Sequence, residues 1–323
     1  MFEQIVTTNN LFLAWELFRN GKRRREDVML FEKNLEDNIF QLQNELTDGY
    51  YYHSQYTPFT IHDPKQRTIH KALVRDRVVH QAIVNVIELL FEKRFIFDSY
   101  SCRVGKGTHA AVKRLRFFLR QASENNTKTV YAVKCDIKKF FASVNHAVLL
   151  ELLTKRIHDQ KTMAVIRNIV RSFSTTPETG IPLGNLTSQL FANIYLHELD
   201  WFVKQKLGLK HYVRYCDDFV ILAQSISEGM ELAKKIDTFL QSRLKVRLHP
   251  DKVFITTWTQ GVDFLGYVIL PEVILVRPTT AKRAIYRSDR NNFQSYLGFC
   301  SHADAYEIEC IIRNKVGSDE SIF

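Results

Sequence analysis

Apolar residues recur at helical spacing through much of the first 125 residues. Leu11, Trp15 and Phe18 lie three or four positions apart and predict an N-terminal helix. The same spacing predicts further helices over 28–46, 78–91 and 109–121. The last of these also carries several basic residues. This part of the chain is therefore expected to be mainly helical.

Between residues 128 and 270 short β-branched or aromatic runs alternate with amphipathic stretches. The runs predict strands over 129–136, 253–257 and 264–269, and a hairpin over 212–222. The stretches between them predict helices over 146–157, 187–206 and 227–244. In the second of these helices Leu190, Ile194 and Trp201 are expected to face inward. Helices packed on one face of an antiparallel sheet would make this an α+β unit.

The predicted hairpin carries two adjacent carboxylates where it turns. Val213 and Tyr215 precede Asp217 and Asp218, and a run of four apolar residues follows them. Two carboxylates at the tip of a buried hairpin repel each other and lose hydration, which is unfavourable unless a cation neutralises them. Because Mg²⁺ prefers oxygen ligands, the pair predicts a magnesium site.

A third carboxylate, Asp136, closes the first predicted strand, 81 residues before Asp217. A strand end and a neighbouring hairpin tip can meet in an antiparallel sheet, so the fold would assemble this site. Two Mg²⁺ ions about 4 Å apart can hold the attacking and leaving oxygens of an in-line phosphoryl transfer. The alternative for a lone Asp at a strand end is a turn or cap residue.

The net charge of the chain indicates what kind of partner it binds. The 323 residues include 45 Lys and Arg against 35 Asp and Glu, a net charge of +10. This balance favours nucleic acid first and an anionic membrane surface second, the alternative being a basic protein with no such partner. The basic run at 21–25, GKRRR, is either a phosphate contact or a solvated loop.

Other features limit the location of the protein. No apolar run approaches the ~20 residues of a membrane helix, and the first residues do not resemble a signal peptide. The five cysteines have no zinc-site spacing, and their odd number argues against a disulfide framework. We therefore expect a cytoplasmic protein, with reduced thiols and no membrane partner.

Several of these patterns resemble one protein family. YCDD at 215–218 resembles the YxDD box of reverse transcriptases, and DIKKFF at 136–141 resembles their first catalytic motif, most like the bacterial and group II intron branch. Further matches are RTIHKALVRDRVVHQ at 67–81, SYSCRVGKGT at 99–108, LKVRLHPDK at 244–252 and GVDFLGY at 261–267. The series covers residues 60–270 in the family's order, which is far more specific than any single box.

The resemblance implies an α+β right-hand polymerase in four segments. These are an N-terminal helical basic extension (1–55), fingers (56–125), a palm of antiparallel sheet plus helices with the catalytic site (126–270) and a small helical thumb (271–323). It implies RNA-directed DNA synthesis, with template RNA, primer, cDNA and dNTPs as partners. It also implies two Mg²⁺ ions, for which Mn²⁺ can substitute, in a bacterial or phage-encoded enzyme.

Roles for single residues follow by matching positions to the family. Asp136 and Asp217 would bind both metal ions, and Asp218 would complete the acidic set. Phe141 falls on the steric-gate position, where a flat ring would clash with a ribose 2′-OH and so favour dNTPs. Simple core packing fits Phe140 better than Phe141.

Three basic residues match positions near the incoming nucleotide. Arg67 and Arg75 match fingers positions that hold the triphosphate, where a cation offsets developing charge. Lys252 matches a lysine near the nucleotide, with an exposed surface lysine after the turn at 249–250 as the alternative.

One motif departs from most of the family. The usual pattern before the long helix is QGxxxSP, whereas Leu183 to Gln189 read LGNLTSQ. The LGxxxSQ form looks like that of the reverse transcriptases of diversity-generating retroelements. That resemblance implies a dNTP pocket containing Leu183 and Gln189, and cDNA copied from a template-repeat RNA with errors opposite adenines, used to diversify a target gene. It also implies a small barrel-shaped accessory protein as partner, and the compact length agrees.

A physical hypothesis follows for Leu183. A Gln beside the incoming nucleotide can hydrogen-bond it, whereas Leu183 can only pack, and discrimination by apolar shape is small. Leu183 would then loosen the pocket and lower fidelity; the alternative is that it simply packs at the helix entry. Two other functions stay open: another compact bacterial reverse transcriptase, retron-like or of phage defence, and a non-catalytic RNA-binding scaffold.

Overall fold

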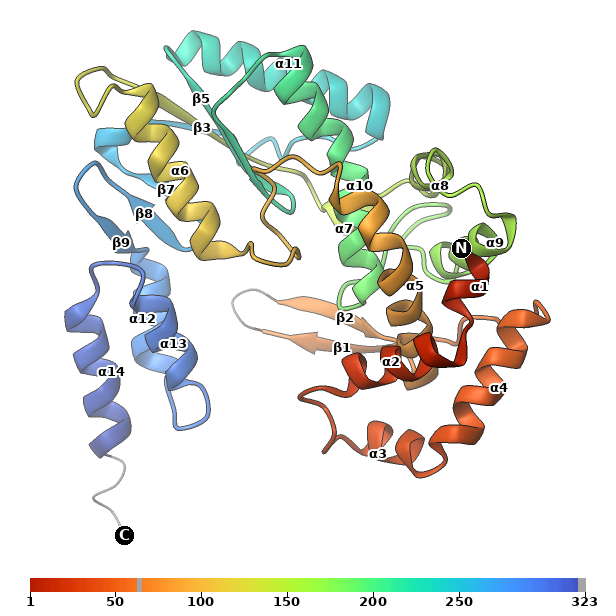
Figure 1. The fold of residues 1–323 in the computed structure, drawn as a ribbon. Helices are drawn as coiled ribbons and strands as arrows, with labels where there is room; N and C mark the ends of the chain where they lie inside the picture. Colours follow the sequence, from red (N-terminus) through yellow and green to blue (C-terminus); the bar gives the residue numbers. More distant parts are fainter. Residues whose placement is uncertain (63–65, 319–323) are drawn as a thin grey trace. The chain divides into compact units, whose positions relative to one another are not determined.

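The computed structural model describes residues 1–62 and 66–318, which form two compact units, each built from several stretches of chain (Figure 1). Unit 1 comprises Met1–Ile96, Ile137–Trp201 and Thr238–Arg247. Unit 2 comprises Phe97–Asp136, Phe202–Asp237 and the described chain from Leu248 onward. Neither unit coincides with one of the four predicted segments, whose boundaries stay a prediction.

Unit 1 is mainly helical. Its helices are α1 (Phe2–Ile5), α2 (Thr8–Arg19), α3 (Glu26–Lys33), α4 (Leu35–Thr47), α5 (Val74–Glu92), α7 (Phe140–Ser143), α8 (His146–Thr154), α9 (Gln160–Arg171), α10 (Leu186–Trp201) and the end of α11 (Ile226–Leu244). Strands β1 (Thr57–Ile61) and β2 (Arg67–Lys71) pair antiparallel. The hydrophobic pattern did not predict this hairpin because neither strand has a fully buried face.

Two predictions in unit 1 were wrong in detail. The continuous helix expected over 28–46 is two helices, because Asn34 leaves the helical conformation at φ −125° and ψ 49°. Asn hydrogen-bonds readily to local backbone and so competes with the helix. In α10, Leu190 and Ile194 are buried as expected, whereas Trp201 is 53% exposed at the last helical residue.

Unit 2 contains a four-stranded antiparallel sheet. Its order is β4 (Tyr212–Tyr215), β5 (Asp218–Ala223), β3 (Tyr131–Asp136) and β6 (Phe254–Thr257). Helix α6 (Thr108–Ala122) lies against one face of this sheet. Gly229 of α11 lies against Val133 and Ile255 on the opposite face. The expectation that helices cover only one face was therefore wrong.

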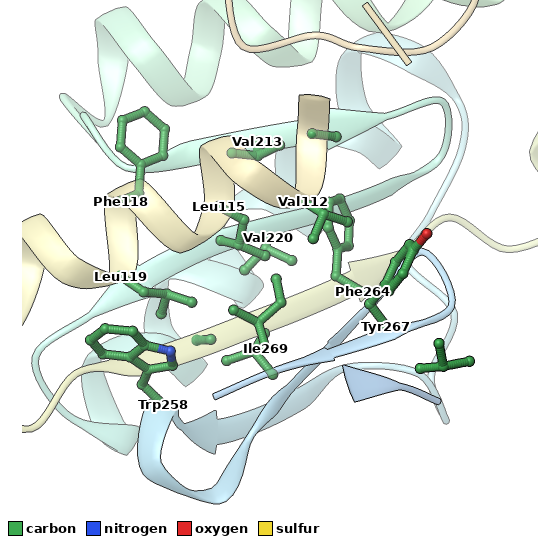
Figure 2. Packing of buried hydrophobic residues seen from close by; sticks show 14 of the residues in the cluster. Val112, Leu115, Phe118, Leu119, Val213, Val220, Trp258, Phe264, Tyr267 and Ile269 are labelled. Carbon is green, nitrogen blue, oxygen red and sulfur yellow. The ribbon is translucent and has the colours of Figure 1, made fainter. Parts of the chain in front are cut away.

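A single hydrophobic cluster joins α6 to this sheet (Figure 2). Val112, Leu115 and Leu119 of α6 pack with Val213 and Val220 of the hairpin strands. The cluster also includes Trp258, Phe264, Tyr267 and Ile269, which follow β6 in the chain. Burial of this many large side chains fixes the hairpin against the rest of unit 2.

The chain after β6 forms a second sheet and three helices. After the 3₁₀ turn η2 (Trp258–Gln260), the sheet consists of β7 (Val262–Phe264), β8 (Tyr267–Ile269) and β9 (Ile274–Val276). The helices are α12 (Pro278–Arg287), α13 (Phe293–Cys300) and α14 (Tyr306–Ser318). Earlier in unit 2, the π-helical turn η1 (Phe202–Lys206) precedes β4. The single strand predicted over 264–269 is a hairpin that turns at Leu265 and Gly266, both with positive φ. Within the described ranges, no helix is long and apolar enough to cross a membrane.

Gly229 provides a test of the packing between α11 and the sheet. An added Cβ would lie 2.8 Å from Cγ2 of Val133, a stiff β-branched side chain in the central strand. We expect Gly229→Ala to lower the free energy of unfolding by about 1–3 kcal/mol. Gly298→Ala in α13 is the control, because its Cβ would meet nothing within 4 Å. It should raise stability by roughly 0.5–1 kcal/mol in urea denaturation. A stabilised Gly229→Ala would contradict the packing.

Candidate active site

The hairpin turns between Tyr215 and Asp218, which are cross-strand partners. Cys216 and Asp217 are the two residues of the turn, and Cys216 has a positive φ of 54°. Asp217 therefore lies in the turn itself, and Asp218 is the first residue of β5. This arrangement confirms the tight turn that the sequence predicted.

The adjacent strand β3 brings Asp136 to the same place. Asp136 and Asp218 are cross-strand partners at the ends of β3 and β5. Directly opposite side chains lie on one face of a sheet, with Cβ atoms about 4.5–5.5 Å apart, and two like charges there are destabilising. The sheet thus places Asp136 beside Asp218, although the two are far apart in the sequence. Asp217 directly precedes Asp218 in the chain.

Electrostatics in this corner favours protonation of Asp218. The pKa of Asp218 is raised to about 6, mainly by burial. The charge of Lys134 lowers this pKa, those of Asp217 and Asp136 raise it, and that of Lys252 lowers it. A shift in this direction means that the folded protein holds a negative charge here at a cost. A cation bound beside these carboxylates would remove the cost.

Two lysines lie beside the carboxylates. Lys252 donates a hydrogen bond to Oδ2 of Asp136 at 2.9 Å, and the Lys252 amide donates to His249, whose own amide donates to the Asp136 carbonyl. Lys252 is therefore held next to Asp136 and is not an isolated surface lysine. Lys134 precedes Asp136 by two residues on the same strand face and pairs with Asp263 at 3.2 Å.

The donor chemistry of the three aspartates suits a hard divalent cation, because all the available ligands are carboxylate oxygens. Within residues 1–62 and 66–318, however, no three His, Cys, Asp or Glu side chains lie close enough to hold a metal as they stand. In addition, the Lys252 ammonium occupies Oδ2 of Asp136. A metal at Asp136 would have to compete with this ammonium group.

Phe141 and Leu183 belong to one hydrogen-bonded region of unit 1. The Phe141 carbonyl accepts from Ile181, and the Leu183 carbonyl accepts from His70 of β2. Phe141 and Leu183 are both half-buried, whereas Phe140 is a core residue, as its sequence position suggested. Gly184 takes a φ of +98°, where a Cβ would lie 2.7 Å from Ile69. The loop before α10 thus lies directly on β2.

The two predicted triphosphate arginines have different surroundings. Arg67 is exposed at the start of β2. Arg75 is instead paired with Glu45 of α4, lies 4.0 Å from Asp76 and packs over the Tyr51 ring. Any contact of Arg75 with a nucleotide would therefore compete with an ion pair inside unit 1.

Gln189 lines a cavity of about 540 Å³ within unit 1. Four cations line the same cavity, together with Phe18, Phe59 and other residues: Lys22, Arg25, Lys71 and Arg77. Burial lowers the pKa of Lys22, and the charges of Arg25 and Arg77 lower it further. Lys71 and Arg77 both pair with Asp27, so the positive potential of the wall comes mainly from Lys22 and Arg25, and an anionic ligand would relieve it. Two residues of the basic run at 21–25 lie in this wall.

Comparisons with known proteins decide the family. The family described as "Reverse transcriptase (RNA-dependent DNA polymerase)" matches residues 62–269. The chain belongs to the reverse transcriptase family. Among curated relatives, protein YkfC of Escherichia coli K12 is 25% identical to this reverse transcriptase over 272 residues, which cover 71% of this chain and 70% of that protein.

Two further similarities concern longer proteins. The group II intron-encoded protein LtrA of Lactococcus lactis is 25% identical over 321 residues, covering 77% of this reverse transcriptase and 52% of LtrA. A solved apo telomerase from Candida tropicalis has a TM-score of 0.52 at 13% identity, covering 74% of this chain and 59% of that one. The telomerase likeness shows a right-hand polymerase fold, in agreement with the α+β class predicted from the sequence. The chain spans about half the length of LtrA.

Sequence reasoning missed two basic residues that lie at the candidate site. Lys134 could have been found, because side chains two apart on a strand share a face and Lys134 precedes Asp136 by two. Arg214 was visible as one charged residue within an otherwise apolar and aromatic strand, yet it is completely buried. Asp263, which pairs with Lys134, and Ser99, which binds Arg214, come from distant segments that the pattern alone does not indicate.

The raised pKa of Asp218 predicts a pH-dependent stability. Between about pH 4 and 6 the folded protein binds more protons at this group than the unfolded chain does, so the group destabilises the fold increasingly as pH rises through this window. We expect Asp218→Asn to be more stable than wild type by about 2–3 kcal/mol at pH 7, and by little at pH 4, in urea unfolding with EDTA. An equal difference at both pH values would contradict this assignment.

Proposed function

We propose that this reverse transcriptase is an active RNA-directed DNA polymerase whose chemistry takes place at Asp136, Asp217 and Asp218. The observation that carries the proposal is the register of β3 and β5, which sets Asp136 opposite Asp218 beside the turn residue Asp217. Membership of the reverse transcriptase family supports polymerase activity. In the reaction the primer 3′-oxygen bonds to the α-phosphorus of a dNTP, and pyrophosphate leaves with its bonding electron pair.

The carboxylates would hold the cofactor. Two Mg²⁺ ions, or Mn²⁺ in their place, would bind to Asp136 and Asp217, with Asp218 completing the set, and would supply Lewis-acid stabilisation of the transferred phosphoryl group. Asp136 and Asp217 would hold these ions at the reacting groups. Lys252 holds Asp136 in place before substrate binds, and its ammonium offsets the negative charge of the site.

Residues of unit 1 would bind the substrates. We assign the triphosphate to Arg67, whose guanidinium is exposed, and the exclusion of a ribose 2′-OH to the Phe141 ring. Arg75 is a weaker candidate for binding the triphosphate, because Glu45 already pairs with it. The cationic cavity that Gln189 lines suits the template RNA, since its lysines and arginines match a phosphate backbone and its phenylalanines match bases.

The proposed biological role is the diversification of a target gene. The LGxxxSQ sequence at 183–189 supports this role, with error-prone cDNA made from a template-repeat RNA and a small barrel-shaped accessory protein as partner. Leu183 offers only an apolar side chain, and its carbonyl is already bound by His70. A nucleotide beside it would be selected by shape alone. The similarity to LtrA favours a second candidate, a reverse transcriptase of the group II intron type without mutagenic copying.

Replacement of Asp217 tests the catalytic assignment. We expect Asp217→Asn to lower primer extension on an RNA template on the order of a thousandfold, because a metal ligand is lost while the turn keeps its shape. Circular dichroism and thermal unfolding should show an intact fold. Asp251→Asn is the control, since this side chain is 87% exposed and should leave activity unchanged. An active Asp217→Asn enzyme would overturn the proposed function.

Replacement of Leu183 tests the proposed cause of infidelity. We expect Leu183→Gln to reduce misincorporation opposite template adenine by about tenfold, because a polar group would hydrogen-bond and restrain the incoming nucleotide. Sequenced primer-extension products provide the measurement. Leu183→Met is the control that keeps the site apolar and should leave the error spectrum unchanged. If Leu183→Gln misincorporates as often as wild type, Leu183 only packs at the start of α10.

A further inference from the structure

Arg214 is a buried cation next to the catalytic turn. It lies in β4, two residues before Cys216, and its exposed fraction is 0%. Burial of a guanidinium costs several kcal/mol unless hydrogen bonds and charges around it compensate. The hydrogen bonds of Arg214 show what compensates this cost.

The Arg214 guanidinium approaches the turn from the face opposite Asp218. In the register of the hairpin, Tyr215 lies opposite Asp218 and Arg214 lies opposite Phe219. Because side chains alternate along a strand, the Arg214 side chain projects from the other face of the sheet. The Arg214 side chain thus leaves the sheet on the face opposite the one on which Lys252 pairs with Asp136.

Its hydrogen bonds go to the turn and to a neighbouring loop. Nη1 donates to the carbonyl of Cys216 at 3.1 Å, and Nη2 donates to Oγ of Ser99 at 3.0 Å. The Arg214 backbone is bound as well: its amide donates to the backbone carbonyl of Asp98, and its carbonyl accepts from the backbone amide of Tyr100. Since β4 is the edge strand of the sheet, this loop covers the edge and fixes Arg214 through both main chain and side chain.

The loop is itself anchored by charge. Asp98 is 5% exposed, and its two carboxylate oxygens pair with different elements of unit 2. Oδ1 accepts from Arg114 of α6 at 2.8 Å, and Oδ2 accepts from Lys204 of η1 at 2.9 Å. A buried acid held by two cations is a rigid point. The position of Ser99, and hence of the Arg214 guanidinium, is fixed from outside the hairpin.

The carbonyl that Arg214 binds belongs to a strained residue. Cys216 has a φ of 54°, a region that non-glycine residues adopt at an energetic cost when the surroundings impose it. The next peptide group carries Asp217. A change in the Cys216 conformation would rotate this peptide and redirect the Asp217 side chain.

We propose that Arg214 is a positioning residue that locks the Cys216–Asp217 peptide and so directs the Asp217 carboxylate. The guanidinium connects the strained turn to Ser99, and through the loop to the Asp98 anchor on α6 and η1. The inference rests on the proposed function, because it assumes that Asp217 binds a metal ion. It assigns to the residue before the YCDD box a role in metal affinity and turnover, with no contact to substrate.

The test compares Arg214→Met with wild type in full-length protein. Met keeps an apolar stem of similar length and removes the hydrogen bonds to Cys216 and Ser99. Replacement of buried ionic groups by apolar residues of similar volume is often neutral for stability. We expect binding of Mn²⁺ alone, followed by electron paramagnetic resonance without nucleic acid, to weaken about tenfold or more, as for other groups that orient metal ligands. We expect kcat for primer extension to fall similarly, with KM for dNTP and the melting temperature little changed. Arg214→Lys carries one ammonium in place of the forked guanidinium. Its Mn²⁺ affinity and kcat should lie between those of wild type and Arg214→Met.

Arg116→Met is the matched control. Arg116 also donates to backbone carbonyls in unit 2, those of Pro271 and Glu272, but it does not touch the turn. Its loss should leave Mn²⁺ affinity and kcat unchanged. An Arg214→Met protein that binds Mn²⁺ and turns over normally, or that is only less stable, contradicts the positioning role. If Asp217→Asn itself retains activity and Mn²⁺ binding, the proposed function fails instead.

Discussion

Opposition of Asp136 and Asp218 across β3 and β5 is the constraint on which the rest of the site depends. Two carboxylates in register on one face repel each other, and burial removes the water that would screen them. The raised pKa of Asp218 is a direct result. A fold selected for stability alone would place apolar or oppositely charged residues there. The proposed function gives a reason for this repulsion, since the same pair would bind a cation there.

The surrounding structure limits this cost and keeps the geometry rigid. On the carboxylate face, Lys252 pairs with Asp136 and Lys134 lies beside it. On the other face, Arg214 binds the turn backbone, and a doubly paired Asp98 anchors its loop. The hydrophobic cluster beneath α6 holds the strands in register. Cations thus act in two ways, by offsetting charge on one side and by fixing the backbone on the other.

The sequence predicted most helices and strands from α2 to β8, but not β1, β2, α7 or α9, nor the individual elements after β8. Several of the errors share a cause. The break at Asn34 and the turn at Leu265 and Gly266 interrupt runs whose apolar pattern continues through them. Trp201 continues the helical pattern of α10 yet lies exposed at its end. The β1–β2 hairpin has no fully buried face and so left no periodic signal. Periodicity reports which side chains are buried, and it is weak where backbone conformation or exposure decides the structure.

By itself the sequence determined the three aspartates, their order along the chain, the ordered motifs of a reverse transcriptase and the LGxxxSQ departure. Local chemistry is enough for the pair Asp217 and Asp218, because paired acids between apolar strands are costly anywhere in a fold. The motifs follow from the resemblance to the family. Only the tertiary structure decided the partners: Asp136 with Lys252, Arg75 with Glu45, and Arg214 with Ser99 and Cys216. Most of these pairs join residues far apart in the chain. Their choice depends on which segments pack together, and a pattern of neighbouring residues carries no record of that.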